Sequence, residues 1–339
     1  MTGREIWRRY RLRHKRRYLL IRALRRFRRD LTVLVDRTQA IRSSDILGFA
    51  TVRNEALRLP RFLDHHRQMG VAQFLIVDNG STDGTLDYLR AQPDVSLWST
   101  QKSYRSARFG MDWINALLMR YGHGHWCLTL DADECLILPH HDSRDLRDLT
   151  AWLDARGERA FAAMMLDLYA TGPLEQVRYT SGQAFEEALS FYDAFNYTWE
   201  RSPKYRDIQI HGGPRARVLF ADQPELAPHL HKIPLIFWNW RYAYVSSTHV
   251  ALPDSLNHGF DARLDLPTGA LLHSKLLPDL QVMADLVDAR SEYHHDPALY
   301  DGYFERLRES PVFDWAEARR YRDWRDLEAD GILTRGQWI

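Results

Sequence analysis

The chain has 339 residues, of which 45% are apolar and 27% charged, and a net charge of +1. It is long enough for one large domain or two ordinary ones, and it has no apolar run of about 18 residues, which excludes a membrane-spanning helix. Its two cysteines, Cys127 and Cys135, form no Cys-x-x-Cys motif, so neither a zinc site nor a disulfide framework is indicated, and a reduced, cytoplasmic compartment is expected.

Residues 1–45 are predicted to form a basic amphipathic N-terminal segment. Residues 1–30 contain thirteen Lys or Arg and two acidic residues, a charge of +11 that leaves −10 for the rest of the chain. The apolar stretch 18–24 is short and is interrupted by Arg22, unlike a signal-peptide core. An apolar stripe at helical spacing is predicted from Leu20, Leu24, Phe27 and Leu31.

Three functions are open for this basic helix. It can lie on anionic lipid at the inner face of the cytoplasmic membrane. It can instead pack its stripe against the acidic remainder of the chain, or bind nucleic acid. The membrane surface is the favoured partner, and nucleic acid is the least favoured.

Three apolar runs follow, and each is predicted to be a strand that ends in a polar cluster. The runs are residues 46–52, 74–77 and 126–130. The clusters after them are Arg53-Asn54-Glu55, Asp78-Asn79-Gly80-Ser81-Thr82-Asp83-Gly84-Thr85 and Asp131-Ala132-Asp133-Glu134. Helices are expected between them at residues 58–69, 85–91 and 111–121. This alternation implies a parallel sheet with right-handed crossovers, whose polar strand ends gather at one edge.

The pair Asp131 and Asp133 is the most informative of these features. Carboxylates directly after a buried strand are costly unless they are paired or bound to a metal ion. Two hard oxygen ligands suit Mg²⁺ or Mn²⁺, which commonly bridge to phosphate oxygens. Because Asp-x-Asp also occurs by chance in solvated loops, the prediction depends on the two polar clusters upstream.

Together the three clusters resemble the family 2 glycosyltransferases, most closely a bacterial branch with the motifs Arg-Asn-Glu, Asp-Asn-Gly-Ser-Thr-Asp-Gly-Thr and Asp-Ala-Asp-Glu. The resemblance is specific over residues 46–139, weaker from 161 to 277, and absent at both ends. It implies the GT-A fold, a Rossmann-like α/β domain with a mainly parallel sheet flanked by helices, which binds a nucleotide-diphospho-sugar.

The resemblance also implies roles for the strand-end residues. Asp131 would reach the ribose or the metal ion, and Asp133 would bind Mn²⁺ or Mg²⁺ directly. The residues expected to contact the nucleotide-sugar are Arg53, Asn54, Glu55, Asp78 and Asn79. A plain strand–turn–helix connection remains the alternative for the Asp78 cluster.

Two arginines precede the helix at 111–121. Arg105 and Arg108 can contact a diphosphate through charge-assisted hydrogen bonds near the start of that helix. The alternative, surface arginines without a ligand, is equally compatible with the sequence.

A catalytic base is expected in the second half of the chain, after a helix at 148–156 and a strand at 161–169. Inverting enzymes of this fold use a carboxylate beyond the metal motif to deprotonate the acceptor hydroxyl. Asp167, which interrupts the strand, is the first candidate and Asp193 the second. The family's usual Glu-Asp signature is missing, and a structural, hydrogen-bonded Asp167 is the alternative.

Two histidines and a lysine complete the predicted site. His249 and His273 resemble C-terminal motifs of related families, in which one histidine joins the metal ligands. Lys232 is expected to neutralise the leaving diphosphate. A histidine in the core or at the surface is the alternative for both positions.

The predicted protein is therefore a metal-dependent, inverting glycosyltransferase acting on a glycan or lipid-linked acceptor in surface polysaccharide synthesis. Its expected parts are the N-terminal segment 1–45, a GT-A domain at 46–278 with nucleotide-sugar and acceptor halves at 46–139 and 140–278, and a helical C-terminal extension at 279–339. A nucleotidyltransferase of the same fold and a non-catalytic glycan-binding or scaffold protein are the alternatives. The first of these usually has a Gly-rich basic loop near its N-terminus, which residues 46–60 lack.

Overall fold

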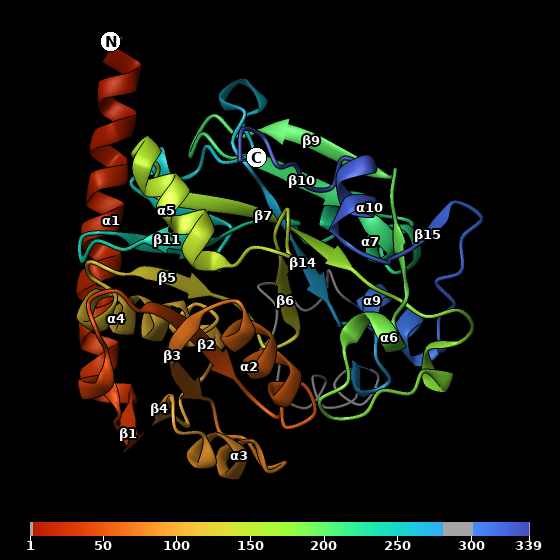
Figure 1. Cartoon of the computed structure of the whole chain (residues 1–339), viewed down its shortest axis with the longest axis horizontal. Coiled ribbons are helices and arrows are strands. Elements are labelled where there is room, and N and C mark those ends of the chain that lie inside the picture. Colours follow the sequence, from red (N-terminus) through yellow and green to blue (C-terminus); the bar gives the residue numbers. More distant parts are fainter. Residues whose placement is uncertain (1–2, 281–300, 339) are drawn as a thin grey trace.

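A computed structural model describes residues 3–280 and 301–338. It is an α/β structure built on a nine-stranded sheet with the order β1-β4-β3-β2-β5-β11-β7-β14-β6 (Figure 1). The strands are β1 Thr32–Val35, β2 Ile46–Val52, β3 Val71–Asp78, β4 Val95–Ser99, β5 Trp126–Thr129, β6 Glu134–Ile137, β7 Ala160–Asp167, β11 His231–Phe237 and β14 Gly269–His273. The fold class predicted from the sequence is thus confirmed as α/β.

The sheet is more mixed than predicted. Strands β2, β3, β4 and β5 are parallel to one another, and β14 is parallel to β7. However, β11 runs antiparallel to both β5 and β7, β6 runs antiparallel to β14, and β1 runs antiparallel to β4. As a result, the start of β11 lies at the same edge of the sheet as the carboxyl ends of β5 and β7.

Helices cover both faces of the sheet, because successive apolar side chains along its strands point to opposite faces. Ala50 and Val52 of β2 pack with α2 and α5 on one face, whereas Phe49 packs with α4 on the other. The larger helices are α1 Gly3–Asp30, α2 Leu59–Gln68, α3 Thr85–Ala91, α4 Met111–Tyr121 and α5 Leu146–Arg156. The three helices predicted in the first half of the chain lie within a residue of their expected bounds.

Smaller elements flank the second half of the sheet. The helices are α6 Phe185–Ala188, α7 Gly213–Val218, α9 Asp301–Arg308 and α10 Trp324–Ala329. The short strands form three pairs, β9 Tyr197–Arg201 with β10 Ile208–Gly212, β12 Ala243–Ser246 with β13 Val250–Leu252, and β8 Phe191–Asp193 with β15 Ala318–Arg320.

The N-terminal segment is part of the same body. After α1, strand β1 joins the edge of the main sheet, and Leu12, Leu19 and Ala23 of α1 are buried. The predicted stripe is correct in part, because Leu20, Phe27 and Leu31 pack against the body but Leu24 is 49% exposed. Helix α1 lies along one side of the molecule, with its first turns extending past the sheet (Figure 1).

The C-terminal segment also packs back onto the body. Trp338 is buried in the core cluster that contains α2 and α5, and Trp324 of α10 packs beside β14 and β6. Within the predicted extension at 279–339 the described residues form a strand, β15, as well as helices α9 and α10; residues 281–300 lie outside the described residues.

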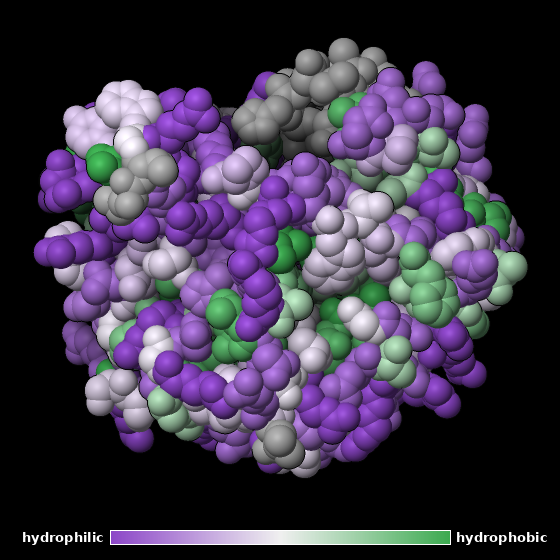
Figure 2. All heavy atoms as spheres, turned by 90° about the horizontal axis from the view of Figure 1, so that it is seen from above, coloured by the Kyte–Doolittle hydropathy of each residue, from purple (hydrophilic) through white to green (hydrophobic). Residues whose placement is uncertain are grey.

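The surface seen from the end at which α1 begins is mostly hydrophilic, with small scattered hydrophobic areas (Figure 2). None of the helices described is both long and apolar enough to cross a bilayer. Cys127 and Cys135 are buried and free, in keeping with the prediction that they form no disulfide.

Candidate functional site

The carboxyl ends of the parallel strands meet at one edge of the sheet, as the sequence predicts. Asp131 and Asp133 lie in the short link that leaves β5 and enters β6. Because β11, β7 and β14 stand between β5 and β6 in the sheet, this link crosses the ends of all three strands. The acidic pair is therefore brought next to side chains that are distant in the sequence.

Lys232, at the start of β11, is the first of these neighbours. Its Nζ lies 2.9 Å from Oδ2 of Asp131 and also donates to Oε1 of Glu134. The lysine is 3% exposed, and although burial opposes its charge, Asp131 and Glu134 raise the pKa of Lys232. The ammonium is therefore fixed directly beside the predicted metal motif.

A chain of buried charges passes through Asp133 and Asp167. His273, the last residue of β14, places Nε2 3.3 Å from Oδ2 of Asp133 and Nδ1 2.6 Å from Oδ1 of Asp167. Arg215 of α7 donates from Nε to the other oxygen of Asp167 at 2.7 Å. Lys275 adds a second cation, with Nζ 3.4 Å from Oδ2 of Asp133.

The protonation states follow from these partners. Although burial opposes both charges, the His273 and Lys275 cations hold the pKa of Asp133 well below its usual range, and Asp133 and Asp167 raise the pKa of His273. Both ring nitrogens of His273 face carboxylate oxygens, an arrangement that favours the protonated ring.

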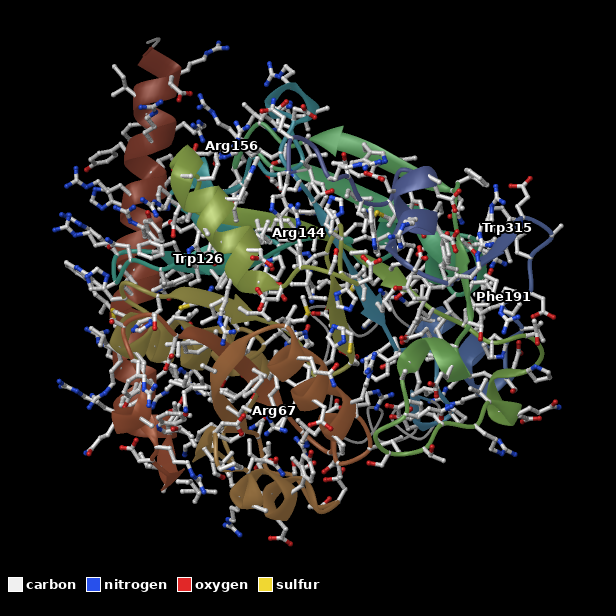
Figure 3. The ribbon with its side chains drawn as sticks, viewed as in Figure 1. Arg67, Trp126, Arg144, Arg156, Phe191 and Trp315 are labelled. Atoms are coloured by element: carbon white, nitrogen blue, oxygen red, sulfur yellow. The ribbon has the colours of Figure 1, made fainter. Side chains whose placement is uncertain are left out.

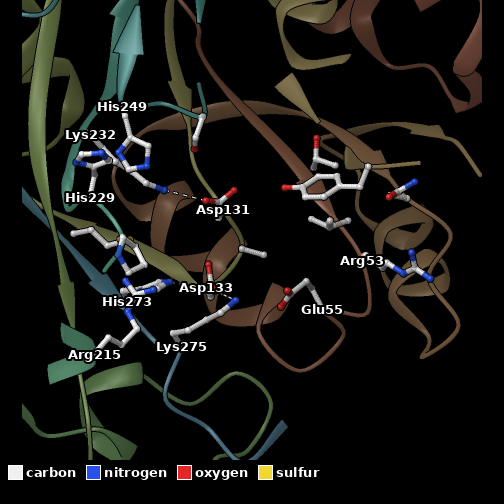
Figure 4. A pocket seen from close by; sticks show the side chains of 18 residues that line it. Arg53, Glu55, Asp131, Asp133, Arg215, His229, Lys232, His249, His273 and Lys275 are labelled. Atoms are coloured by element: carbon white, nitrogen blue, oxygen red, sulfur yellow. Dashed lines mark hydrogen bonds and ion pairs between the residues drawn. The ribbon is translucent and has the colours of Figure 1, made fainter. Parts of the chain in front are cut away.

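These groups line a cavity of about 280 Å³ that is partly open to solvent. Figure 4 shows the basic residues Arg215, Lys232, His273 and Lys275 on one side of Asp131 and Asp133, and Glu55 and Arg53 on the other. The remaining lining residues are Thr51, Val52, Asn79, Tyr104, Ala132, Met165, Pro228, His229, Ser247 and His249. Its volume lies at the lower end of the range of small-molecule sites, which is about 300–1,000 Å³.

Glu55 faces this cavity from the end of β2. Its side chain is 21% exposed and lies 3.4 Å from Nη1 of the buried Arg58, which also forms a two-bond pair with Asp279. Burial raises the pKa of Glu55 to about 7, with Arg58 opposing the shift and Asp133 adding to it. Glu55 can therefore exchange a proton near neutral pH.

Of the other residues predicted to contact the nucleotide, some line the cavity and others have a structural role. Arg53 and Asn79 line the cavity, and Asn79 is held by its Nδ2, which donates to the carbonyls of Thr100 and Lys102. Asp78 is fully buried, and its carboxylate accepts hydrogen bonds from the backbone of Gly80 and Ser81. Asp78 thus shapes the turn and does not line the cavity.

Asn54 also has a local structural role. Its Oδ1 accepts from the backbone N–H of Thr82 at 2.8 Å, and its backbone has a positive φ of 55°. This contact ties together the turns that follow β2 and β3. Asn54 therefore positions Arg53 and Glu55 at the cavity without lining it.

Arg105 and Arg108 do not line the cavity. Arg108 instead donates from Nε to Asp112 at 2.7 Å and from Nη1 to the carbonyl of Val245 at 2.7 Å. Arg105 lies in a short 3-10 turn before α4, outside the lining. For these two positions the structure favours the alternative without a ligand.

The predicted catalytic bases are also outside the lining. Asp167 is fully buried and both of its oxygens are engaged. Asp193 is likewise buried, and it accepts from Arg217, Tyr169 and Asn196. A carboxylate that neither reaches the cavity nor has a free oxygen is poorly placed to accept a substrate proton, so the geometry contradicts both assignments.

The four predicted metal ligands share the cavity, but they are not arranged around one point. No group of three His, Cys, Asp or Glu side chains in the part of the chain that the structure describes is suited to hold a metal ion. Both ring nitrogens of His273 already contact carboxylate oxygens, of Asp133 at 3.3 Å and of Asp167 at 2.6 Å. His249 is better suited, because burial lowers its pKa well below the usual range and leaves the ring neutral.

Lys275, Arg58 and His229 join the site although the sequence assigned them no role. Lys275 follows the predicted ligand His273 by two residues, so its place in the sequence could have indicated a role in the site. Arg215 also joins the site, from the stretch His211-Gly212-Gly213-Pro214-Arg215, for which the sequence favours a plain turn over a sugar-binding or phosphate-binding loop. Arg58 lies three residues after Glu55 and contacts it, whereas His229 has no local motif and is brought here by the packing of distant segments.

Comparisons with known proteins give no family for the chain. No family model and no curated protein matches it. Among solved structures, a 4-diphosphocytidyl-2C-methyl-D-erythritol synthase is similar, at 19% identity and a TM-score of 0.24 over 41% of this chain and 64% of that one. The chain thus spans just under two thirds of that protein, and a likeness of this size bears on neither family nor activity. The fold and site define an α/β protein with a cation-rich cavity at the carboxyl edge of its strands.

Proposed function

We propose that this protein is a glycosyltransferase that moves a sugar from a nucleoside-diphosphate donor to a glycan or lipid-linked acceptor, in the synthesis of a surface polysaccharide. The observation that carries the proposal is the position of the Asp131-Ala132-Asp133 link, which lines one cavity with Arg53, Glu55 and four further basic groups. Open α/β sheets bind ligands at this edge. The motifs that resemble family 2 glycosyltransferases lie around the same cavity.

In the proposed reaction the acceptor hydroxyl oxygen attacks the anomeric carbon as the bond from that carbon to the diphosphate oxygen breaks. The leaving diphosphate keeps the bonding electrons and is stabilised by Lys232, Lys275 and Arg215. Glu55 lines the cavity and its pKa is raised to about 7, which suits a base near neutral pH, so we assign it the acceptor proton. Inversion at the anomeric carbon is proposed from the resemblance.

The first test is nucleotide selectivity. The melting temperature of the full chain is measured with UDP, GDP, dTDP and CDP, followed by release of the matching diphosphate from its sugar nucleotides. A ligand that binds the native state stabilises it by about 2.7 kcal/mol at a concentration of one hundred times its Kd. We expect one nucleotide diphosphate to give the largest shift and its sugar nucleotide to be consumed.

A matched pair of variants tests whether the consumption of the sugar nucleotide depends on the cavity. Asp131 and Asp142 are similarly exposed, at 47% and 50%, but only Asp131 lines the cavity. Asp131→Asn should lower sugar-nucleotide turnover, while Asp142→Asn should not. Binding of no nucleotide diphosphate would refute the proposal, and pyrophosphate release from a nucleoside triphosphate would identify a nucleotidyltransferase instead.

We further propose that the outer face of α1 lies on an anionic membrane that carries the acceptor. The inner face of the helix packs on the body through Leu12, Leu19 and Ala23. The opposite face presents Trp7, Tyr10, Tyr18 and Ile21, each at least half exposed, among exposed arginines. Basic side chains project from the outer side of this helix (Figure 3). Aromatic and basic residues on one exposed face are typical of helices in a lipid interface.

This surface is tested by sedimentation of the full chain with phosphatidylcholine vesicles, with and without phosphatidylglycerol. We expect sedimentation only with the anionic lipid, decreasing at high salt. The triple change Trp7→Ser, Tyr10→Ser and Tyr18→Ser should abolish it, whereas Phe195→Ser, at an exposed phenylalanine beside Arg319 of β15, should not. Equal sedimentation of both variants would contradict the proposal.

A further inference from the structure

Two lysines occupy the positions next to the acidic pair. Lys232 places Nζ 2.9 Å from Oδ2 of Asp131, and Lys275 places Nζ 3.4 Å from Oδ2 of Asp133. They come from the start of β11 and from just beyond β14, so two strands that neighbour β7 on either side deliver them to one cavity. Each carboxylate of the Asp-x-Asp motif therefore already has a cation on one oxygen.

This arrangement conflicts with the divalent metal that the sequence predicts. A metal ion on these oxygens would have to displace one or both lysines, since two cations repel each other at such distances. Both ring nitrogens of His273 are already engaged with carboxylate oxygens, at 3.3 Å and 2.6 Å. The residues present thus fit ammonium groups better than a metal ion.

Arg215 gives an independent sign that the cavity binds an anion. Its side chain lines the cavity and is 8% exposed, and Nε is held by Asp167. Its Nη2, however, is buried without a hydrogen-bond partner among residues 3–280 and 301–338. An unpaired buried guanidinium nitrogen is costly, and a phosphate oxygen is a geometrically suitable acceptor for it.

The charge of the lining favours the same ligand. Arg53, Arg215, Lys232 and Lys275 outnumber the carboxylates Glu55, Asp131 and Asp133. The lining is therefore net positive by itself. A cavity that relied on a metal ion for its positive charge would be expected to have an acidic lining.

We propose that Lys232, Lys275 and Arg215 bind the diphosphate of the donor directly, so that nucleotide binding requires no divalent metal ion. This inference rests on the proposed function, and it concerns how that site holds its donor. A lysine ammonium has more N–H donors than these contacts with carboxylates use, so both lysines can keep their partners and still donate to phosphate. Asp131 and Asp133 then act as positioning residues for the two ammonium groups.

The test measures binding of UDP, GDP, dTDP and CDP to the full chain by calorimetry, in excess EDTA and separately in Mn²⁺. We expect the nucleotide that binds best to have the same Kd in both conditions, and its affinity to fall as salt is added. Binding in Mn²⁺ but not in EDTA would overturn this inference and leave the proposed function intact. Failure to bind in either condition would instead count against the proposed function.

Variants assign the effect to the named cations. Lys275→Met, at a side chain 30% exposed, is expected to fold and to weaken binding in EDTA by about tenfold or more, the value of a charged hydrogen bond. Lys204→Met is the matched control at an exposed lysine outside the cavity and should bind as the natural chain does. Unchanged binding by Lys275→Met would overturn the role of that lysine. Because Lys232 is deeply buried, it is tested as Lys232→Met combined with Glu134→Gln, with folding checked by circular dichroism.

Discussion

Asp167 shows how the partners of a single residue decide its chemistry. Its two oxygens accept from His273 at 2.6 Å and from Arg215 at 2.7 Å, and it has no exposed surface. Although burial opposes the charged form, Arg215 and His273 hold the pKa of Asp167 below its usual value. Asp167 is therefore a positioning residue that holds an imidazolium and a guanidinium at the cavity wall.

Removing this charge should destabilise the fold. Asp167→Asn leaves Arg215 and His273 without their buried counter-ion, and breaking a buried pair costs about 3–5 kcal/mol. Asp142→Asn, which removes a half-exposed partner of Arg325, should cost less than about 1 kcal/mol. Denaturant unfolding of both variants measures the two changes, and equal losses would contradict this role for Asp167.

The pH dependence of that difference has a defined sign. Because the folded pKa of Asp167 lies below its ordinary value of 3.8, its contribution to stability is present above that pH. The contribution is lost as the pH falls through the lowered folded value. The stability gap between the natural chain and Asp167→Asn should therefore be full at neutral pH and shrink in acid.

Glu55 should set the pH dependence of turnover. Its folded pKa of about 7 lies above the ordinary value of 4.5, so a base at this position is protonated in mild acid. Turnover should rise with pH through about 7 and then level off. Glu55→Gln should lower kcat by roughly 10²–10⁴-fold, remove this rise, and leave the melting shift with the bound nucleotide in place. A pH profile unchanged in Glu55→Gln would exclude Glu55 as the base.

At the scale of elements, α1 is held to the body by its inner face as well as by charge. Arg22 pairs with the buried Asp112 of α4 at 2.6 Å, and Asp30 accepts from Nε1 of Trp113 at 3.2 Å. Part of the basic charge near the N-terminus thus has a structural role. The arginines on the outer face are available to an external partner. Packing of α1 against the body and binding of α1 to a membrane are therefore compatible with each other.

The two faces of α1 should respond differently to truncation. Leu19 is 2% exposed and Ile21 is 50% exposed on the same helix. Leu19→Ala should destabilise the chain by about 2–5 kcal/mol through the cavity it leaves, while Ile21→Ala should change stability by less than about 0.5 kcal/mol. Thermal and denaturant unfolding distinguish these outcomes, and a small effect of Leu19→Ala would show that α1 is only loosely attached.

At the scale of the whole molecule, the predicted nucleotide-sugar and acceptor halves share one sheet. Strand β11 of the second half lies between β5 and β7, and β6 of the first half lies beyond β14. Each half therefore completes the hydrogen bonding and the core of the other. The cavity belongs to neither half alone, because its acidic residues come from one and most of its cations from the other.

Residues 46–139 expressed alone should accordingly not fold. The fragment leaves one edge of β5 unpaired and gives β6 no partner strand, and it lacks the edge strand β1 and helix α1. We expect no cooperative denaturant transition by circular dichroism, while the full chain unfolds cooperatively. A cooperative transition in the fragment would show that the first half is an independent domain.

Local sequence determined much of this protein. Apolar runs and turn residues were sufficient to predict β2, α3 and α4 with their bounds, and the strand-end clusters placed Arg53, Glu55, Asn79, Asp131 and Asp133 at one edge. These predictions succeed because the periodicity of apolar residues, the capping of helices and the position of a residue at a strand end depend only on residues close in the sequence. The tertiary structure alone decided the partners of the acidic pair. Lys232, Lys275 and Arg215 reach it through pairings between strands far apart in the sequence, and Asp167, a good candidate base by position, is excluded because those same pairings bury it between two cations.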